Sequence, residues 1–181
     1  MNDESEMTFY YNGQHYALYK DSFNSLVEGH YLNDIIVEFF VKWMIGKDKN
    51  VYVMNSHCLN ACAQGKFIRD LTDCELIFST IFGDNHWSLL VYFHPNREDG
   101  FVAHFDSLHI HNTDWAENKV NAFLQKHTTL KNLRTQRKCF HFSKQTNNTD
   151  CGVFVCLYGI KIYELYKKWV FSQLLPNSDH C

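Results

Sequence analysis

The feature that most constrains the fold is the passage from a short polar loop into an apolar segment at residues 145–158. The loop begins with Gln145, and Cys151 and Gly152 stand where it gives way to apolar residues. Charged residues return only from position 161 onward. The pattern predicts a helix over residues 151–171 whose first half is buried and whose second half reaches solvent.

A cysteine at the start of such a helix is suited to nucleophilic chemistry. The thiolate is the reactive form, whereas an ordinary thiol is mostly protonated at neutral pH. The unpaired N–H groups and the positive dipole end of a helix start favour the anion of Cys151. The side-chain amide of Gln145 and the backbone N–H of Cys151 would together form an oxyanion hole. Gly152 leaves room where a substrate approaches the helix.

Two further candidate residues stand at the ends of predicted strands. His86 heads an apolar strand over residues 87–93, and Asp106 follows a strand over residues 102–105. An imidazole beside Cys151 would stabilise the thiolate and later protonate a leaving amine. Asp106 could accept the proton of the other ring nitrogen and fix its tautomer. Alone, each residue is more often structural, but the complete ordered set indicates a cysteine nucleophile with its base.

With these residues in place, the sequence resembles the Ulp/sentrin-specific proteases, a family of papain-like cysteine peptidases. The resemblance runs from about residue 16 to residue 166. It rests on His86-Trp87, Asp106, Gln145 six residues before Cys151, and Tyr31-Leu32-Asn33-Asp34, which is similar to the family's Trp-Leu-Asn-Asp box.

The resemblance implies an α+β, papain-like cysteine protease fold in which the nucleophile helix packs against a mixed central sheet. It implies hydrolysis of the peptide or isopeptide bond after the C-terminal Gly-Gly of a ubiquitin-like modifier, by processing or deconjugation. Within the family, residues 86–92 are most similar to the deneddylase type of sentrin-specific protease. We therefore expect NEDD8 to be the favoured modifier, with SUMO next.

The resemblance also assigns substrate-binding residues. Trp87 and Tyr31 are implied to roof a tunnel for the Gly-Gly tail, and Asp34 to read the body of the modifier. Tyr31 departs from the family pattern, which usually has tryptophan at this position.

The hydrophobic periodicity predicts a mixed order of helices and strands. A hairpin is expected over residues 9–19 around Asn12-Gly13. Helices are predicted over residues 32–44, 60–70, 115–126 and 151–171, and strands over residues 51–53, 75–82, 87–93, 102–105 and 139–142.

Composition limits the organisation and the partners. The 181 residues predict one catalytic domain, residues 1–181, with 1–7 disordered and 174–181 a short polar tail. A net charge of −3 gives no sign of nucleic-acid binding. No signal peptide or transmembrane-length apolar run is evident, and seven cysteines without framework spacing indicate a reducing compartment. We expect a monomer in the cytoplasm and/or the nucleus, away from membranes.

A metal site is the main competing interpretation. His57-Cys58 with Cys62 supplies possible ligands, as does a second group, His104, His109 and His111. The sequence has no Cys-x-x-Cys pair, and these spacings are not those of a zinc module. We expect His104 to face away from the aspartate that follows it, and we expect no metal and no cofactor.

Two functional alternatives remain open. An acyltransferase would use the same cysteine and histidine to carry an acetyl group from acetyl-CoA, usually with glutamate as the third residue. A catalytically inactive binder of ubiquitin-like modifiers would need none of the four catalytic residues. Because the third residue is Asp106 and all four are present, the protease is favoured over both.

Overall fold

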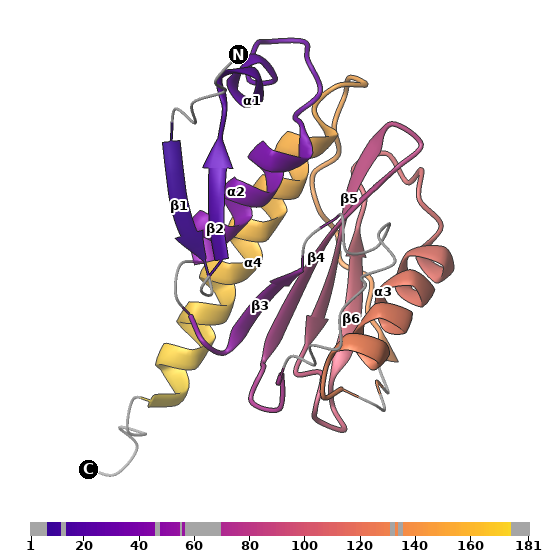
Figure 1. Ribbon diagram of the computed structural model, residues 1–181. Coiled ribbons are helices and arrows are strands. Elements are labelled where there is room, and N and C mark those ends of the chain that lie inside the picture. The colour runs from indigo at the N-terminus through magenta and orange to yellow at the C-terminus, as the bar shows by residue number, and fades with distance from the viewer. Residues whose placement is uncertain are drawn as a thin grey trace, which may run out of the picture.

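A computed structural model describes residues 7–11, 14–45, 48–54, 56, 70–130, 133 and 136–174. Helices gather on one side of a central sheet, with a further helix on the other side (Figure 1). In chain order the elements are β1 (Met7–Tyr11), β2 (Gln14–Leu18), α1 (Lys20–Asn24), α2 (Asp34–Ile45), β3 (Val51–Met54), β4 (Leu76–Gly83), β5 (His86–Phe93), β6 (Phe101–Phe105), α3 (Thr113–His127), β7 (Gln136–Arg137) and α4 (Cys151–Leu174).

The central sheet is mixed. Its strand order is β3-β4-β5-β6-β7, and a separate antiparallel hairpin of β1 and β2 lies over the helical side (Figure 1). The β4-β5 and β5-β6 pairs are antiparallel, whereas β3-β4 and β6-β7 are parallel. The predicted α+β class with a mixed central sheet is confirmed.

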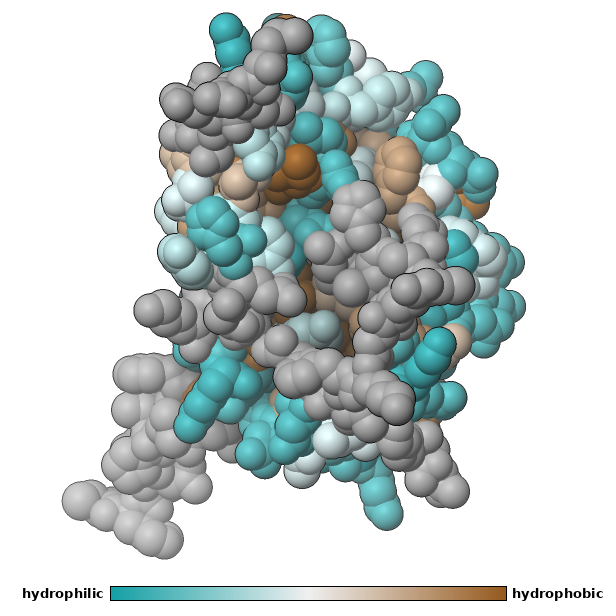
Figure 2. Space-filling model, viewed as in Figure 1, coloured by the Kyte–Doolittle hydropathy of each residue, from teal (hydrophilic) through white to brown (hydrophobic). Residues whose placement is uncertain are grey.

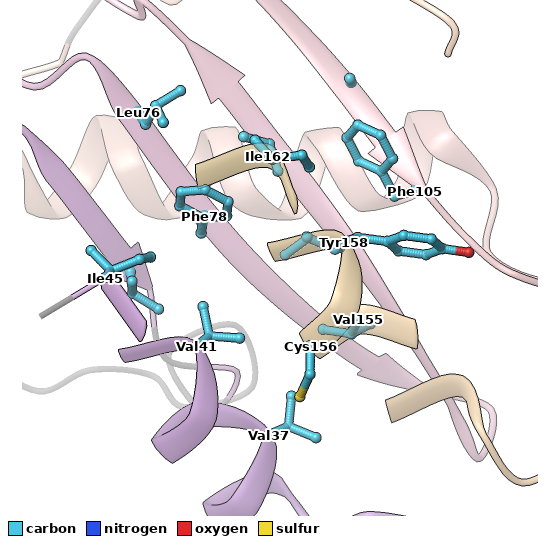
Figure 3. Close-up of a cluster of buried hydrophobic side chains, with 14 of the residues drawn as sticks. Val37, Val41, Ile45, Leu76, Phe78, Phe105, Val155, Cys156, Tyr158 and Ile162 are labelled. Carbon is cyan, nitrogen blue, oxygen red and sulfur yellow. The ribbon is translucent and has the colours of Figure 1, made fainter. Parts of the chain in front are cut away.

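The sheet is covered on both faces, so its strands are apolar almost throughout. Along β4, Leu76 and Phe78 pack with α2 and α4, whereas Ile77 and Ile81 pack with α3. This alternation follows from the period of two in a strand. Figure 3 shows the larger cluster, in which side chains of α2 and α4 meet those of β4 and β6. The buried first half of α4, predicted from its apolar sequence, lies in this cluster.

The helices α2 and α4 pack closely at the start of α4. A Cβ atom added at Gly152 would lie 2.9 Å from Cβ of Leu32 and 3.2 Å from Cγ2 of Val37. The sequence suggested that this glycine makes room for substrate. The structure corrects this: the space is filled by Leu32 and Val37, so glycine permits contact between α4 and the segment that begins α2.

The connection between β4 and β5 is as short as a hairpin allows. Asp84 and Asn85 have φ values of 49° and 53°, and Gly83 pairs with His86 across them. Two successive residues with positive φ form the turn whose twist matches that of the flanking strands. His86 is therefore held at the first position of β5 by a turn of fixed geometry.

Several predicted elements differ from the observed ones. Residues 139–142 do not form a strand, and the pairing at this edge is made by β7. The Phe140 ring instead stacks on Phe105, and the Phe142 ring contacts Phe105 at a tilt. The short helix α1 was not predicted, and Met7, expected to be disordered, begins β1. Leu174, predicted to begin the polar tail, is instead the last residue of α4, and residues 175–181 lie outside the described residues. Of the predicted helix over residues 60–70 only Asp70 is described, and it is not helical. In the described part of the chain, no helix has the length and apolar character needed to span a membrane.

The glycines of α4 give a test of this packing. Gly152→Ala should lower the free energy of unfolding by about 1–3 kcal/mol, because the new methyl group overlaps Leu32 and Val37. Gly159→Ala is the matched control, since its Cβ would meet Val41 at an ordinary 3.7 Å. That variant should be neutral or up to about 1 kcal/mol more stable, because alanine favours helix. Urea unfolding measures both, and equal effects would contradict the proposed contact.

Candidate active site

The loop before α4 is organised to present Cys151 at the first position of the helix. Oδ1 of Asn147 accepts from the backbone N–H groups of Thr149 (3.1 Å) and Asp150 (3.0 Å). Nδ2 of Asn147 donates to Asp150 Oδ2 at 2.7 Å, and the Asp150 carbonyl accepts from the N–H of Phe154. These bonds fix where the helix begins, and Cys151 is fully buried at that point.

His86 and Asp106 form a close buried pair. Nε2 of His86 lies 2.7 Å from Oδ1 of Asp106, and the two residues are only 2% and 3% exposed. A carboxylate is only an acceptor, so Nε2 carries the proton and donates it. The other nitrogen, Nδ1, is then the one that faces away from the aspartate and is available to a thiol. The geometry expected from the sequence is therefore present.

The carboxylate of Asp106 accepts backbone bonds as well. The N–H groups of Leu108 and His109 donate to Oδ1 at 3.0 and 2.9 Å, and that of His111 donates to Oδ2 at 2.8 Å. Burial alone would raise the pKa of Asp106. The bonds from His86, His111 and Leu108 outweigh burial and hold this pKa below its usual value. Asp106 is therefore ionised at neutral pH.

The pKa of His86 also depends on the nearby thiol of Cys151. Burial by itself lowers the pKa of His86, but hydrogen bonds to Asp106 and Cys151, with the charges of both, raise it to about 9. The imidazolium is then the favoured form at neutral pH, and it stabilises a thiolate beside it. The sequence predicted this juxtaposition from three separated motifs, and the structure brings them together.

The orientation of the Gln145 amide is set by its partners. Its Oε1 accepts from the hydroxyl of Ser107, and its Nε2 donates to the carbonyl of Asn147 at 2.8 Å. One further N–H of this amide can point at an oxyanion, alongside the backbone N–H of Cys151. Sequence reasoning missed Ser107, whose only signal is its place directly after Asp106.

A cavity of about 630 Å³ adjoins the candidate site through Trp87, which follows His86 in β5, and Leu32, which meets α4 at Gly152. Its lining comes from the segment that leads into α2, from the β4–β5 hairpin and from one residue that follows β3: Tyr31, Leu32, Asn33, Asp34, Phe82, Asn85, Trp87 and Ser56. Hydrophobic residues reach the surface between the helical and sheet halves, near the start of α2 (Figure 2). The five tunnel and box residues expected from the sequence therefore share one cavity: Tyr31, Leu32, Asn33, Asp34 and Trp87.

The two aromatic rings have different settings in this cavity. Trp87 is 1% exposed, donates its indole N–H to the Leu32 carbonyl at 3.0 Å and packs against Phe82. Tyr31 is 48% exposed. Trp87 thus forms a fixed wall of the cavity, whereas Tyr31 stands at its open side. Asn33 caps α2 through Oδ1, which accepts from the N–H of Ile36 at 2.9 Å.

The other cysteine of the first turns of α4 has a different environment. Burial raises the pKa of Cys156 to about 12, so this thiol stays protonated. Cys139 is free and exposed. Among the described cysteines, Cys151 is the one that lies beside a histidine with an ordered carboxylate partner.

One expectation about the histidines is wrong. His104 was expected to face away from Asp106, yet ligand atoms of His104, Asp106 and His111 all lie within 4.8 Å of one another. Residues two apart along a strand point to the same face, so His104 and Asp106 are on one side. Both nitrogens of each histidine have hydrogen-bond partners, which favours a structural role over metal binding. The other group, His57, Cys58 and Cys62, lies outside the described residues.

Comparison with known protein families gives a match over residues 30–179, to the Ulp1 protease family, C-terminal catalytic domain. The chain belongs to the Ulp1 protease family. It is accordingly a cysteine protease, as the resemblance implied. A comparison with curated proteins gave no match.

Solved structures share the fold of this Ulp1-family chain. A de-sumoylating protease has a TM-score of 0.69 and 20% identity, covering 87% of this chain and 72% of that one. The C-terminal Ulp1 protease domain in complex with Smt3, the yeast ortholog of SUMO, has a TM-score of 0.64 and 17% identity, and the match covers 92% of this chain and 79% of that one. A Ulp1-like SUMO protease catalytic domain from Chaetomium thermophilum has a TM-score of 0.62 and 20% identity, and the match covers 90% of this chain and 73% of that one. These likenesses confirm the papain-like α+β fold.

The pH dependence of stability tests the His86–Asp106 pair. Because the folded pKa of His86 is raised to about 9, its contribution is complete below pH 6.5 and is lost as pH rises through about 9. Asp106, with a lowered pKa, stays ionised throughout this window. Asp106→Asn should reduce the loss of stability between pH 6.5 and 9.5 by on the order of 1–3 kcal/mol.

Urea unfolding of both proteins at the two pH values measures this difference. Thiols and tyrosines that ionise only in the unfolded chain contribute equally to both proteins and cancel. An unchanged pH dependence in Asp106→Asn would contradict a charged His86–Asp106 pair.

Proposed function

We propose that this Ulp1-family protease hydrolyses the bond after the C-terminal Gly-Gly of a ubiquitin-like modifier. The observation that carries the proposal is the convergence of Cys151, His86 and Asp106 beside the cavity that holds Trp87 and Tyr31. In this reaction Cys151 is the nucleophile and His86 is the acid and base. Asp106 orients His86, and Gln145 stabilises the oxyanion.

The reaction uses the charged form of His86, which its raised pKa favours at neutral pH. The thiolate of Cys151 attacks the carbonyl carbon of the last glycine, and the resulting oxyanion accepts bonds from the Gln145 amide and the Cys151 N–H. As the C–N bond breaks, the imidazolium of His86 gives its proton to the leaving amine and a thioester remains. Neutral His86 then takes a proton from water, which attacks the thioester and releases the modifier carboxylate and the thiol.

The cavity gives a reason for the choice of glycine. One wall is the immobile indole of Trp87, held by its bond to the Leu32 carbonyl. Tyr31 lies at the open side. The proposal requires that a tail held between the two rings leaves no room for a Cβ atom. Contacts with the folded body of the modifier, in which Asp34 would take part, supply the energy that holds the tail in place.

Two modifiers are candidates. The resemblance of residues 86–92 supports NEDD8. SUMO is supported by two proteins of similar fold, one described as a de-sumoylating protease and one found in complex with Smt3, the yeast ortholog of SUMO. Both tails end in Gly-Gly, so the cavity accepts either. We therefore propose NEDD8 and SUMO as the modifiers to test, with ubiquitin as the comparison.

Capture by activated modifiers tests the nucleophile. NEDD8, SUMO and ubiquitin with a C-terminal propargyl amide should be compared, and at least one should form a covalent adduct with the wild-type chain. Cys151→Ala should form none but should still bind the same modifier, because the cavity does not depend on sulfur. Cys139→Ser, which removes an exposed free thiol, is the matched control and should react like the wild type.

The same assay separates the alternatives. A catalytically inactive binder would bind a modifier and form no adduct. An acyltransferase would instead become acetylated at Cys151 by acetyl-CoA. Adduct formation that persists in Cys151→Ala would show that the nucleophile is wrongly assigned.

A second experiment tests the aromatic channel. Tyr31→Ala should lower cleavage of a full-length fluorogenic modifier by roughly ten- to a hundredfold, but alkylation of Cys151 by iodoacetamide by less than about twofold. Tyr31→Trp should be tolerated. Tyr31 is the better position for this test because Trp87 is part of the core, and its removal would also destabilise the fold.

The tail of the modifier gives the complementary measurement. A Gly-Ala tail should be cleaved far more slowly than a Gly-Gly tail, because the added methyl group meets the rings. Equal steady-state rates for the two tails would rule out a channel that selects glycine.

A further inference from the structure

Behind the His86–Asp106 pair lies a continuous chain of buried polar side chains. Ser88 Oγ lies 2.7 Å from Nδ1 of His111 and 2.9 Å from Nε2 of His104. The chain continues from Nδ1 of His104 to the Thr113 hydroxyl at 3.0 Å, and from Nε2 of His111 to the Gly83 carbonyl at 2.9 Å. Its members come from β4, β5, β6, the loop before α3 and α3 itself.

The proton positions in this chain follow from one fixed end. The Gly83 carbonyl is only an acceptor, so Nε2 of His111 carries a proton. In a neutral imidazole Nδ1 is then an acceptor, and Ser88 donates to it. Ser88 has one proton, so it accepts from Nε2 of His104.

The same assignment of donors and acceptors extends to Thr113, at the other end of the hydrogen-bond chain. Because Nε2 of His104 is the donor, its Nδ1 accepts, and the Thr113 hydroxyl donates to it. Every donor thus meets an acceptor when both histidines are neutral and protonated on Nε2. Burial lowers the pKa of His104 to about 4 and also lowers that of His111, so both are neutral at physiological pH.

The chain is attached to both members of the candidate catalytic pair. The backbone N–H of His111 donates to Oδ2 of Asp106 at 2.8 Å. Its ring lies edge-on to that of His86, with centroids 5.1 Å apart. Its Nε2 holds the carbonyl of Gly83, the residue that pairs with His86 across the β4–β5 turn. A shift of His111 would therefore move Asp106 and the start of β5 together.

We propose that the Thr113–His104–Ser88–His111 chain is a positioning device for the His86–Asp106 pair. It sets the direction from which the carboxylate meets the imidazole, and thereby the direction in which the imidazole faces Cys151. This inference rests on the proposed function of that pair, but its residues do not touch the substrate. They act through Asp106 and through the backbone at Gly83.

Ser88 is the position at which the chain can be cut with least change in volume. Ser88→Ala removes the donor to His111 and the acceptor of His104. Ser79→Ala is the matched control, since Ser79 is an equally buried serine on the neighbouring strand β4. Within the described residues its hydroxyl has no hydrogen-bond partner.

The expected result is a loss of turnover without a loss of binding. Ser88→Ala should lower kcat on the captured modifier by roughly ten- to a hundredfold, since small misplacement of catalytic groups has effects of this size. The Kd for that modifier should change by less than about twofold. Ser79→Ala should leave both quantities within about twofold of wild type. Equal kcat values for the two variants would overturn the proposal.

The far end of the chain gives a rescue experiment. Thr113→Val removes the donor to His104 and should lower kcat, by a smaller factor than Ser88→Ala does. Thr113→Ser restores a hydroxyl and should return kcat to the wild-type value. Failure of Thr113→Ser to recover what Thr113→Val loses would contradict a role for the hydroxyl.

A measurement that needs no modifier distinguishes this inference from the function on which it rests. Nitrogen-15 NMR of the wild-type chain at pH 7 should show His104 and His111 both neutral and both protonated on Nε2. In Ser88→Ala, iodoacetamide alkylation of Cys151 should slow while urea unfolding shows the protein still folded. An Nδ1-protonated tautomer of His104 or His111 would overturn the proposed hydrogen-bond chain, whatever modifier the protein cleaves.

Discussion

The candidate site depends on one buried carboxylate. Asp106 is almost inaccessible to water, and an ionised carboxylate there would be unstable without donors on both of its oxygens. It receives three backbone N–H groups from the loop that follows it and one imidazole N–H from β5. The loop is shaped around the aspartate, and the aspartate in turn gives His86 its charge and orientation. Removal of this carboxylate would leave several donors unsatisfied as well as the histidine.

Leu32 links the substrate cavity to the nucleophile helix. Its carbonyl accepts the indole N–H of Trp87, and its side chain fills the space above Gly152. The cavity wall and the start of α4 are thereby held at a fixed separation by one residue of the segment before α2. This contact explains why a glycine directly follows Cys151 even though no substrate need touch it.

Much of this arrangement could be predicted from sequence, and the failures have physical reasons. His86, Asp106, Gln145 and Cys151 could be placed because each stands where an apolar run begins or ends, and strand and helix ends gather at one edge of such a fold. The box that contains Asp34 was found by resemblance. Both kinds of signal involve residues close together in the chain, so they can be recognised in a single sequence.

The features that were missed depend on contacts between distant segments. The bond from Ser107 to Gln145 joins residues 38 positions apart, and nothing near either residue indicates it. Residues 139–142 have the composition of a strand, but Phe140 and Phe142 make ring contacts with Phe105 in place of strand pairing. For His104, the alternation of side chains along a strand was misapplied: residues two apart, such as His104 and Asp106, face the same side of the sheet.

The two-residue turn at Asp84-Asn85 limits where residues can be inserted or deleted between β4 and β5. Adjacent residues of a strand face opposite sides of the sheet, so one inserted or deleted residue in the turn would exchange the faces of His86 and Trp87. The imidazole would then enter the core and the indole would replace it beside Asp106. Homologous chains that keep this chemistry should therefore keep the number of residues in this turn, even where the residues themselves differ.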